Sequence, residues 1–461
     1  MRVLFVTPEC APFAQAGGLG DVSAALPAAL RALGVEIDVL LPAYSEALAK
    51  LEGASEVAAF QELGCDCRLL RKEHVLALRC AALYEREGTP YQDASGADWP
   101  DNALRFGVLS KVAARLAPGY DVLHCNDWQA ALAPVYEQRT PSVLTVHNLA
   151  FQGVFDREWL TRLGLPQAYF SVDELEFHGR LSFLKGGLVH ADAITTVSAG
   201  YAREIQSEEY GSGLDGVLRA RSSRLTGIIN GIDTAVWDPA NDPRLAARYD
   251  ENGLQRKGAN KEALQRRLNL QVEPDVPLLG FIGRLTHQKG VDLIAAAADE
   301  LVALPAQLVF LGRGERGFEL AAAAAAARHP GRVAAAIGFN EELAHLIEAG
   351  ADIFLMPSRF EPCGLNQMYS QRYGTPPVAR ATGGLADTIS DGETGFLFER
   401  AESAALIAAV RRALEVYRNP ARWREMQRAG MRRDFSWAGP ARRYADLYAA
   451  LARRETPPPG R

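Results

Sequence analysis

The sequence predicts an α/β protein with two doubly wound domains, because short apolar strands alternate with helix-like segments twice along its 461 residues. The first alternation begins at the N-terminus and the second at Pro277. Between them, residues 238–260 are polar and rich in Pro, Gly, Asp and Asn, which interrupt regular structure. We therefore expect a hinge in this segment, with domains at 1–240 and 241–439 and a separate C-terminal segment at 440–461.

The first domain opens with a strand, a glycine turn, a helix and a second strand. The helix is expected at Asp21–Leu33. The strand candidates of this domain are Arg2–Thr7, Glu36–Leu41, 121–123, 142–146 and 193–197. Alanine-rich helical stretches separate several of them, which predicts a parallel sheet with helices on both faces. Residues from about 60 to 110 are less regular.

The second domain repeats the alternation. Its strand candidates are 278–282, 307–311, 332–337, 352–356 and 377–378. A helix-like segment of about 10–15 residues follows each of them, which is typical of βαβ units. From Pro440 to Arg453 the spacing of apolar residues predicts an amphipathic helix. The final PPPGR is expected to be a disordered tail.

Composition excludes several classes of partner. The formal net charge of −6 and the pI near 5.9 argue against nucleic-acid and anionic-membrane partners. The six cysteines form no C-x-x-C pair, which fits a reducing cytosol without a disulfide framework or a zinc site. The apolar run at 3–6 is too short for a signal peptide, and no run approaches the roughly 18–20 residues that span a bilayer. We expect a soluble, cytoplasmic protein; the oligomeric state stays open.

The segment EPCGL at 361–365 is the most informative feature of the second domain. It follows the apolar run 353–356 and is expected to open a helix directly after a strand. In a parallel sheet this position lies at the carboxyl end of a strand, where ligands bind and helix N-termini favour negative groups. Glu361 is then either an acid that faces a ligand or an ordinary first-turn acid favoured by the helix dipole.

Two similar glycine turns occur in the two expected domains, GGLGD at 17–21 and GGLAD at 383–387. Each places two glycines before a helix whose first turn carries Asp. Glycine at such a turn allows close approach of a diphosphate or a sugar to the backbone, and an ordinary strand-to-helix turn is the alternative. Because the turn is repeated, we interpret the two as loops that line one cleft.

The loop GRLTHQKG at 283–290 joins a strand to a helix and places Arg284 and Lys289 five residues apart. An arginine can donate two parallel hydrogen bonds and a lysine supplies a compact charge, so the two together suit a doubly charged phosphate. The alternative is that both are loop cations exposed to solvent. The spacing of a Walker loop and of the Rossmann glycine fingerprint is missing. The sequence also contains no D-x-D, the usual carboxylate pair for a metal–diphosphate complex, so cationic loops would have to carry that charge.

Polar residues also follow strands of the first domain. His147 comes after the strand at 142–146 and either donates to a sugar hydroxyl or is satisfied by local backbone. Asp127 stands beside Trp128, a frequent sugar-binding pairing, although a helix N-cap explains it equally well. Asn230 belongs to a turn and says little alone.

Together the motifs resemble those of bacterial glycogen synthases and plant starch synthases over nearly the whole chain. These are retaining glycosyltransferases of the GT-B arrangement, in which two Rossmann-like domains face each other across a cleft. The matching segments are GGLGDV at 17–22, PYQDASGADWPDN at 90–102, HCNDW at 124–128, TVHNLAFQG at 145–153, NGIDTAVWDP at 230–239, GRLTHQKG at 283–290, SRFEPCGLNQMYSQRYGT at 358–375 and TGGLADT at 382–388.

The resemblance implies a hexosyltransferase of glycogen biosynthesis that moves glucose from ADP-glucose to an α-1,4-glucan, with no metal or other cofactor. Arg284, Lys289, Glu361 and His147 are the implied catalytic groups, with Arg284 and Lys289 on the donor's phosphates and Glu361 beside its glucose. The implied donor-binding residues are Gln15, Gly18, Asp21, Cys363, Gly364, Leu365, Thr382, Gly383 and Gly384. Tyr91, Asp127 and Asn230 are implied near the sugar and the acceptor. The C-terminal helix is implied to pack back on the first domain.

The resemblance breaks at Gln15, where the family usually has the Lys of a K-x-G-G-L motif. An amide keeps hydrogen bonding but loses the charge. Two alternatives therefore stay open beside the glycogen synthase reaction. One is a related transferase that uses UDP-glucose or a shorter acceptor, and the other is a weakly active glucan-binding homologue.

Overall fold

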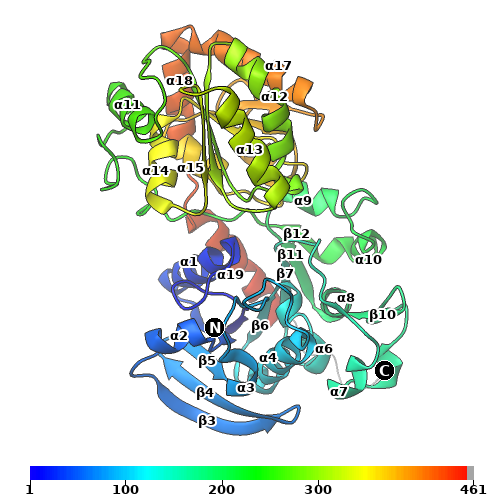
Figure 1. The fold of residues 1–461 in the computed structure, drawn as a ribbon. Coiled ribbons are helices and arrows are strands. Elements are labelled where there is room, and N and C mark those ends of the chain that lie inside the picture. Colours follow the sequence, from blue (N-terminus) through cyan, green and yellow to red (C-terminus); the bar gives the residue numbers. More distant parts are fainter. Residues whose placement is uncertain (454–461) are drawn as a thin grey trace. The chain divides into compact units, whose positions relative to one another are not determined.

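The computed structural model describes residues 1–453, which form two compact units (Figure 1). Of the described residues, unit 1 contains Met1–Gly231 and 437–453, and unit 2 contains Ile232–Ser436. The tail PPPGR expected to be disordered lies outside the described residues. No helix within residues 1–453 combines the length and the apolar character that crossing a membrane requires.

Unit 1 is built on a nine-stranded sheet with the order β12-β11-β7-β6-β1-β2-β5-β4-β3. Seven of these strands run parallel: β1 (Arg2–Val6), β2 (Glu36–Pro42), β5 (Val75–Arg79), β6 (Val122–Asn126), β7 (Ser142–Val146), β11 (Ala193–Thr196) and β12 (Leu225–Gly227). A small second sheet contains β8 (Val154–Phe155), β10 (Arg180–Ser182) and β9 (Glu176–Phe177). The strands expected in the first domain are therefore present.

The edge of the nine-stranded sheet differs from the fully parallel sheet expected. There β4 (Cys65–Lys72) runs antiparallel to both β3 (Ser55–Glu62) and β5. Leu63 and Gly64, both in the left-handed region with φ of 49° and 76°, turn the chain between β3 and β4. Along β3, exposed and half-buried side chains alternate, so this strand lacks the continuous apolar run that identifies a buried parallel strand.

The helices of unit 1 cover both faces of its sheet. They are α1 (Gly18–Ala32), α2 (Ser45–Lys50), α3 (Ala81–Tyr84), α4 (Asn102–Leu116), α5 (Asp127–Ala130), α6 (Ala133–Tyr136), α7 (Trp159–Arg162), α8 (Phe183–His190), α9 (Ala199–Glu204), α10 (Asp215–Ala220) and α19 (Ala438–Ala452). In β1, Val3 and Phe5 pack into the core formed with α1 and α19, whereas Leu4 and Val6 join the core formed with α4. Alternate side chains of one strand thus pack into the cores on the two faces of the sheet.

The C-terminal helix packs on unit 1, as the resemblance implied (Figure 1). Tyr444, Tyr448 and Leu451 of α19 are buried with residues of α1 and the sheet. The hydroxyl of Tyr448 lies 2.6 Å from Nδ1 of His124 in β6. Burial lowers the pKa of His124 to about 3, so the ring is neutral and this contact joins two uncharged groups.

Unit 2 has a six-stranded parallel sheet with the order β15-β14-β13-β16-β17-β18. The strands are β13 (Leu278–Ile282), β14 (Gln307–Gly312), β15 (Val333–Ile337), β16 (Ile353–Met356), β17 (Pro377–Arg380) and β18 (Phe396–Phe398). The five expected strands are present, within two residues at each end. The short β18 was not predicted.

Helices cover both faces of this sheet as well. The core on one face contains residues of α12 (Val291–Ala303), α13 (Arg316–Arg328), α17 (Ser403–Tyr417) and α18 (Pro420–Met431). The core on the other contains residues of α11 (Lys257–Arg267), α14 (Glu341–Gly350) and α16 (Gly383–Thr388). The helix after β17 has six residues where 10–15 were expected. α15 (Asn366–Arg372) is also short, with seven.

The chain changes units after Gly231 and again after Ser436, whereas the sequence placed the boundaries at 240 and 439. The reason lies in the apolar residues scattered through the polar segment after Gly231. Tyr249 and Leu254 are buried against Tyr373 and Met431 of unit 2. This segment is therefore part of unit 2.

Candidate active site

Lys289 and Glu361 form an ion pair in unit 2. Lys289 precedes α12 in the loop after β13, and Glu361 lies in the loop after β16. Because β13 and β16 are neighbouring parallel strands, their carboxyl ends bring these loops together. Lys289 Nζ donates to Glu361 Oε2 at 2.5 Å, and Ser358 Oγ donates to the same oxygen at 3.0 Å. Glu361 is only 5% exposed and the Lys289 side chain 19%, so the pair is largely shielded from water.

The loop position of Glu361 corrects the sequence interpretation. EPCGL does not open the helix, because α15 begins at Asn366. Gly364 adopts a left-handed φ of 72°, which interrupts helical geometry before that residue. An ordinary first-turn acid is therefore no longer an explanation for Glu361. Glu361 is buried against a lysine and a serine, and its role as an acid that faces a ligand stays a prediction.

The loop of Glu361 is packed tightly against the turn that begins α16. Gly384 N donates to the backbone carbonyl of Glu361 at 3.0 Å. A Cβ atom at Gly384 would lie 2.0 Å from the carbonyl oxygen of Cys363, so only glycine fits there. The expected Asp in the first turn is absent in this case, because Gly383 already begins α16 and Asp387 follows its first turn. Thr382, Gly383 and Gly384 thus lie beside the Glu361 and Cys363 backbone.

Arg284 lies at the exposed side of the same loop as Lys289. Its guanidinium contacts the side-chain oxygen of Gln288 at 3.3 Å. The backbone N–H of Arg359 donates to the carbonyl of Gln288 at 2.8 Å, and the Arg359 guanidinium pairs with both oxygens of Asp292 in α12. Ser358 and Arg359 were not predicted as site residues. Arg359 joins the two loops, Ser358 bonds Glu361 within its own loop, and the Arg284 side chain faces solvent.

In unit 1 a buried carboxylate supports the first glycine turn. Glu9, which is 3% exposed, accepts hydrogen bonds at Oε2 from the backbone N–H groups of Ala16 at 2.6 Å and Gly17 at 2.8 Å. Its Oε1 accepts one from the hydroxyl of Tyr91. Glu9 thus joins the turn before α1 to the loop that carries Tyr91. Sequence reasoning missed it, although an acid soon after a buried strand and ahead of a double glycine was an available signal.

Gln15 and Asp21 contact each other across this glycine turn. Gln15 Nε2 donates to Asp21 Oδ1 at 2.9 Å. Gly18 begins α1, and Asp21 lies in its first turn as expected. The amide that replaces the family's usual lysine therefore takes up a hydrogen bond with the neighbouring acid.

Asp127 and His147 meet at the ends of β6 and β7. Asp127 Oδ1 accepts from the backbone N–H of His147 at 2.7 Å, and Nε2 of His147 lies 3.0 Å from the side-chain oxygen of Asn126. Burial raises the pKa of Asp127 to about 7 and lowers the pKa of His147 to about 3. The histidine is therefore neutral, and the acid retains a proton close to neutral pH.

Two interpretations made around Asp127 are wrong. It does not cap its helix, because Asn126 is the N-cap residue of α5 and Asp127 has a left-handed φ of 54°. Trp128 does not offer its ring to a sugar, because it is buried in the core against Phe106 and Phe155. Asn230 is buried as well and follows β12. Residues 1–453 bring together no group of three His, Cys, Asp or Glu side chains suited to a metal ion.

The comparisons with known proteins assign the class first. Residues 263–429 match the family described as glycosyl transferases group 1, and residues 2–220 match the starch synthase catalytic domain. Two Rossmann-like units with these matches define the protein as a glycosyltransferase of the GT-B class.

Close relatives then narrow the assignment. The chain is 53% identical to a glycogen synthase of Aromatoleum aromaticum, with 98% of this chain and 97% of the relative covered. It is 50% identical to a glycogen synthase of Dechloromonas aromatica, with 98% and 99% covered. The chain belongs to the family of bacterial glycogen synthases and starch synthases. The resemblance inferred from the motifs is thereby confirmed.

Solved structures agree with this assignment. The catalytic domain of starch synthase IV from Arabidopsis thaliana, bound to ADP and acarbose, is 31% identical and superimposes with a TM-score of 0.86. That match covers 98% of this chain and 99% of the plant domain. A sucrose-phosphate synthase from Thermosynechococcus elongatus is 19% identical and has a TM-score of 0.63, with 98% of each chain covered. This second likeness concerns the fold alone.

Proposed function

We propose that the protein transfers glucose from ADP-glucose to the non-reducing end of an α-1,4-glucan with retention of configuration. The observation that carries the proposal is the Lys289–Glu361 pair at the carboxyl ends of two neighbouring strands, with Arg284 exposed in the same loop. Membership of the family supports the reaction class. The ADP bound to the Arabidopsis starch synthase IV domain supports the choice of nucleotide.

In unit 2 we assign Arg284 and Lys289 to the diphosphate of the donor. Both side chains are cationic, and the exposure of the Arg284 guanidinium supports its assignment to a phosphate. Cys363, Gly364, Leu365, Thr382, Gly383 and Gly384 are assigned to backbone contacts with the sugar and phosphates. Glu361 holds the Lys289 ammonium in place and supplies negative charge close to the glucose ring.

The chemical step needs charge at both ends of the breaking bond. As the bond between the anomeric carbon and the phosphate oxygen breaks, negative charge grows on the diphosphate and positive charge on the sugar. Arg284 and Lys289 stabilise the negative charge on the diphosphate, and Glu361 stabilises the positive charge on the sugar. The acceptor hydroxyl attacks the same face of the sugar that the phosphate leaves, and its proton passes to the departing diphosphate.

In unit 1 we assign Gly18, Asp21, Tyr91, Asp127 and His147 to the glucose being transferred and to the incoming chain. A neutral His147 donates its one ring N–H from Nε2 to the Asn126 side-chain oxygen, so its Nδ1 can accept a hydrogen bond from a sugar hydroxyl without adding charge. A protonated Asp127 can donate as well as accept. Asn230 is assigned to the acceptor.

Incorporation of labelled glucose tests the proposal directly. The protein is incubated with labelled ADP-glucose and glycogen, with the Glu361→Ala variant as the control for background. Label should enter the glucan and ADP should be released in equal amount. Incorporation no greater than in the control would exclude the reaction.

A second candidate, transfer from UDP-glucose, follows from Gln15. This amide is bonded to Asp21, and it supplies no positive charge where the family usually has lysine. Initial rates with a panel of ADP-, UDP- and GDP-glucose at equal concentration distinguish the two candidates. If the protein transfers glucose from ADP-glucose, kcat/KM should be highest for that donor, and if it uses UDP-glucose, kcat/KM should be highest for UDP-glucose.

Replacing Gln15 by Lys should raise activity. A lysine restores a charged contact that strengthens as the diphosphate leaves, and such a contact commonly contributes on the order of a hundredfold in rate. Because the new ammonium would also pair with Asp21, we expect a smaller gain of about tenfold in kcat/KM for ADP-glucose. Gln15→Met is the matched control, since it keeps the length of the side chain without the charge. An unchanged rate in the lysine variant would show that the missing charge does not limit the reaction.

Replacing Glu9 by Gln should lower kcat/KM about tenfold, which corresponds to about 1.4 kcal/mol. The variant loses charge-assisted hydrogen bonds to Ala16 and Gly17, and these are roughly twice as strong as neutral ones. Tyr91→Phe removes the partner on the other oxygen. If Glu9 acts by joining the two loops, the double variant should lose less than the product of the two single losses. Fully multiplicative losses would contradict this role.

A further inference from the structure

Three of the six cysteines lie together at the antiparallel edge of unit 1, away from the proposed active-site residues. Cys65 and Cys67 belong to β4, and Cys80 follows the end of β5. Arg68 of β4 pairs with Arg79 of β5, so one further step of the antiparallel register places Cys67 opposite Cys80. Cys65 lies two residues earlier on β4 and therefore on the same face as Cys67. The Cys80 side chain also raises the pKa of both Cys65 and Cys67, which places the three thiols close together.

The distance between opposed strands suits a disulfide. Directly opposed residues of an antiparallel pair have Cα atoms about 4.5–5.5 Å apart. Disulfides require about 4.4–6.8 Å, so a Cys67–Cys80 pair that continues the printed register falls within this range. Diagonal neighbours are about 7–8 Å apart, which leaves Cys65 outside this range for Cys80.

The surroundings of Cys80 make its thiol the reactive one. The nearby Cys67 thiol and the backbone N–H of Leu83 favour the Cys80 thiolate and lower the pKa of Cys80 despite its burial. Burial raises the pKa of Cys65. Thiolates, not thiols, attack oxidants, so oxidation should begin at Cys80.

We propose that Cys67 and Cys80 form a reversible cross-strand disulfide when the protein meets a peroxide. The Cys80 sulfur attacks one peroxide oxygen, the O–O bond breaks, and one water leaves, with a sulfenic acid on Cys80. The Cys67 sulfur then attacks the Cys80 sulfur, the S–O bond breaks, and a second water leaves with the Cys67 proton. Two thiols are thereby oxidised by two electrons, and one peroxide is reduced to two waters. A dithiol restores both cysteines by disulfide exchange.

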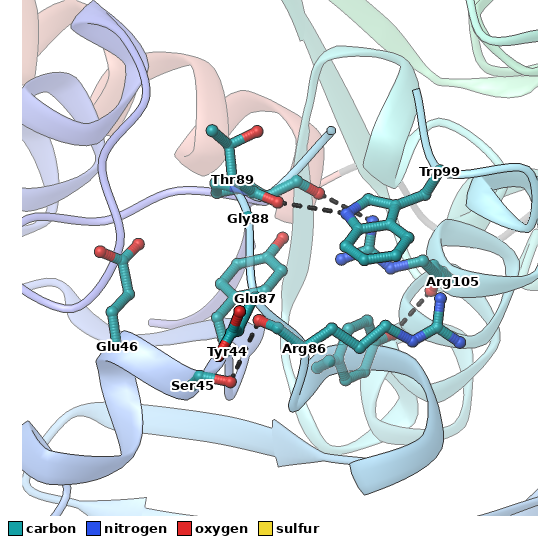
Figure 2. A pocket seen from close by; sticks show the side chains of 11 residues that line it. Tyr44, Ser45, Glu46, Arg86, Glu87, Gly88, Thr89, Trp99 and Arg105 are labelled. Carbon is teal, nitrogen blue, oxygen red and sulfur yellow. Dashed lines mark hydrogen bonds between the residues drawn. The ribbon is translucent and has the colours of Figure 1, made fainter. Parts of the chain in front are cut away.

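Contacts lead from Cys80 to the loop of Tyr91. Cys80 is the N-cap residue of α3. Two residues of α3 bond the buried Arg105. Arg105 Nε donates to Leu83 O at 2.9 Å, and the Tyr84 hydroxyl donates to Arg105 O at 2.6 Å. Arg105 also donates to the carbonyl of Pro90 at 3.0 Å, directly before Tyr91. Figure 2 shows Arg105 near the loop of Glu87, Gly88 and Thr89 that leads to this proline. Tyr84 and Arg105 both line a cavity of about 230 Å³.

A disulfide at Cys80 should therefore disturb the position of Tyr91 and lower activity. This consequence rests on the proposed function, whereas formation of the bond does not. Coupling of this kind through packed side chains commonly changes activity about two- to thirtyfold, and we expect a loss in that range.

Peptide mapping tests the bond itself. The reduced full-length protein is treated with hydrogen peroxide, remaining thiols are alkylated, and tryptic peptides are analysed by mass. A link should join the peptide ending at Arg68 to the peptide 80–86. Because the first peptide holds both Cys65 and Cys67, matched variants identify the partner: Cys65→Ser should keep the link, and Cys67→Ser and Cys67→Val should lose it. No link in the unmodified protein, or a link that survives in both Cys67 variants, would overturn the proposal.

Activity before and after peroxide tests the consequence. We expect the unmodified protein and Cys65→Ser to lose activity and to regain it with dithiothreitol, and Cys67→Ser to keep its activity. An equal loss in Cys67→Ser would place the effect of peroxide at another cysteine and overturn the coupling to Tyr91. The mass measurement remains decisive for the disulfide even if the protein shows no transferase activity, so failure of the proposed function is recognised separately.

Discussion

Glu361→Gln should lower kcat by a factor on the order of 10²–10³, the usual effect of removing one group that stabilises charge in a transition state. The replacement keeps the shape of the side chain and removes its charge. Lys289 then loses the carboxylate that holds its ammonium 2.5 Å away, and the sugar loses a negative neighbour as positive charge develops. Initial rates at saturating ADP-glucose and glycogen measure the effect. Glu425→Gln, on the exposed surface of α18, is the matched control and should leave kcat unchanged.

The same pair allows a stricter test of how Glu361 acts. Lys289→Gln should raise the KM for ADP-glucose as well as lower kcat, because the diphosphate loses a cation and meets a buried carboxylate without its partner. If Glu361 acts mainly by holding Lys289, the double variant should lose much less than the product of the two single losses. Multiplicative losses would mean that the two groups contribute independently, and a kcat of Glu361→Gln within threefold of the unmodified protein would contradict the assignment.

The parallel core of each unit could be predicted from the sequence because its strands are buried on both faces. Runs such as 278–282 and 308–311 contain no polar side chain, and each is followed by a helical pattern. The hairpin of β3 and β4 could not be predicted in the same way. Its strands are partly exposed and mix charged with apolar residues, so neither a continuous run nor a clean alternation marks them.

The residues of the candidate site also differ in whether the sequence predicts them. Arg284, Lys289 and Glu361 stand in recognisable motifs at strand ends, so their positions could be predicted. The sequence marks Glu9 only as an acid between a strand and a double glycine, because its contacts with the backbone of Ala16 and Gly17 and with the distant Tyr91 form only in the fold. The helix start at EPCGL was misplaced for a related reason. Gly364 takes a left-handed φ that only the folded loop reveals.

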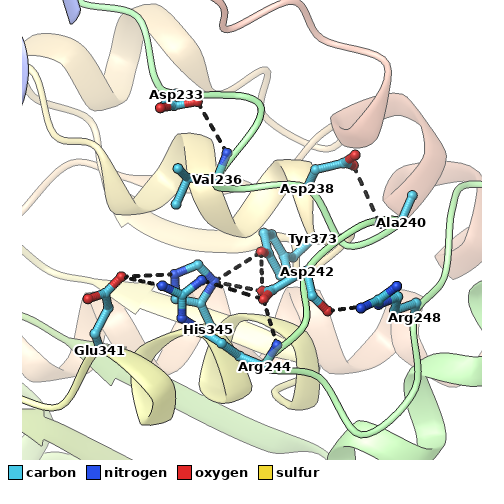
Figure 3. A network of polar contacts seen from close by, with 10 residues as sticks. All are labelled: Asp233, Val236, Asp238, Ala240, Asp242, Arg244, Arg248, Glu341, His345 and Tyr373. Carbon is cyan, nitrogen blue, oxygen red and sulfur yellow. Dashed lines mark hydrogen bonds and ion pairs between the residues drawn. The ribbon is translucent and has the colours of Figure 1, made fainter.

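A buried polar network holds the segment around Asp242, where the chain enters unit 2, against the rest of that unit (Figure 3). The Asp242 side chain is fully buried. Its Oδ2 accepts from the Tyr373 hydroxyl at 2.7 Å and lies 2.7 Å from Nδ1 of His345, and its Oδ1 accepts from the backbone N–H of Arg244 at 2.9 Å. Burial lowers the pKa of His345, so the ring is neutral and donates from Nδ1. Next to the network, Trp237 stacks on the His345 ring at 3.8 Å.

Asp242→Ala should therefore destabilise unit 2 by about 3–5 kcal/mol, because it leaves three donors buried without their shared acceptor. Asp242→Asn should cost about half as much, since its amide oxygen still accepts one or two of these bonds. Chemical denaturation followed by tryptophan fluorescence measures both, and Asp446→Asn on the exposed face of α19 is the control that should leave the midpoint unchanged. Tyr373, which bonds Asp242, is the C-cap residue of α15, the helix that follows Gly364 and Leu365. Loss of the Asp242 carboxylate should therefore also reduce transfer activity at denaturant concentrations below the midpoint. A loss of less than 1 kcal/mol in Asp242→Ala would show that water replaces the carboxylate and that the network does not hold this segment on unit 2.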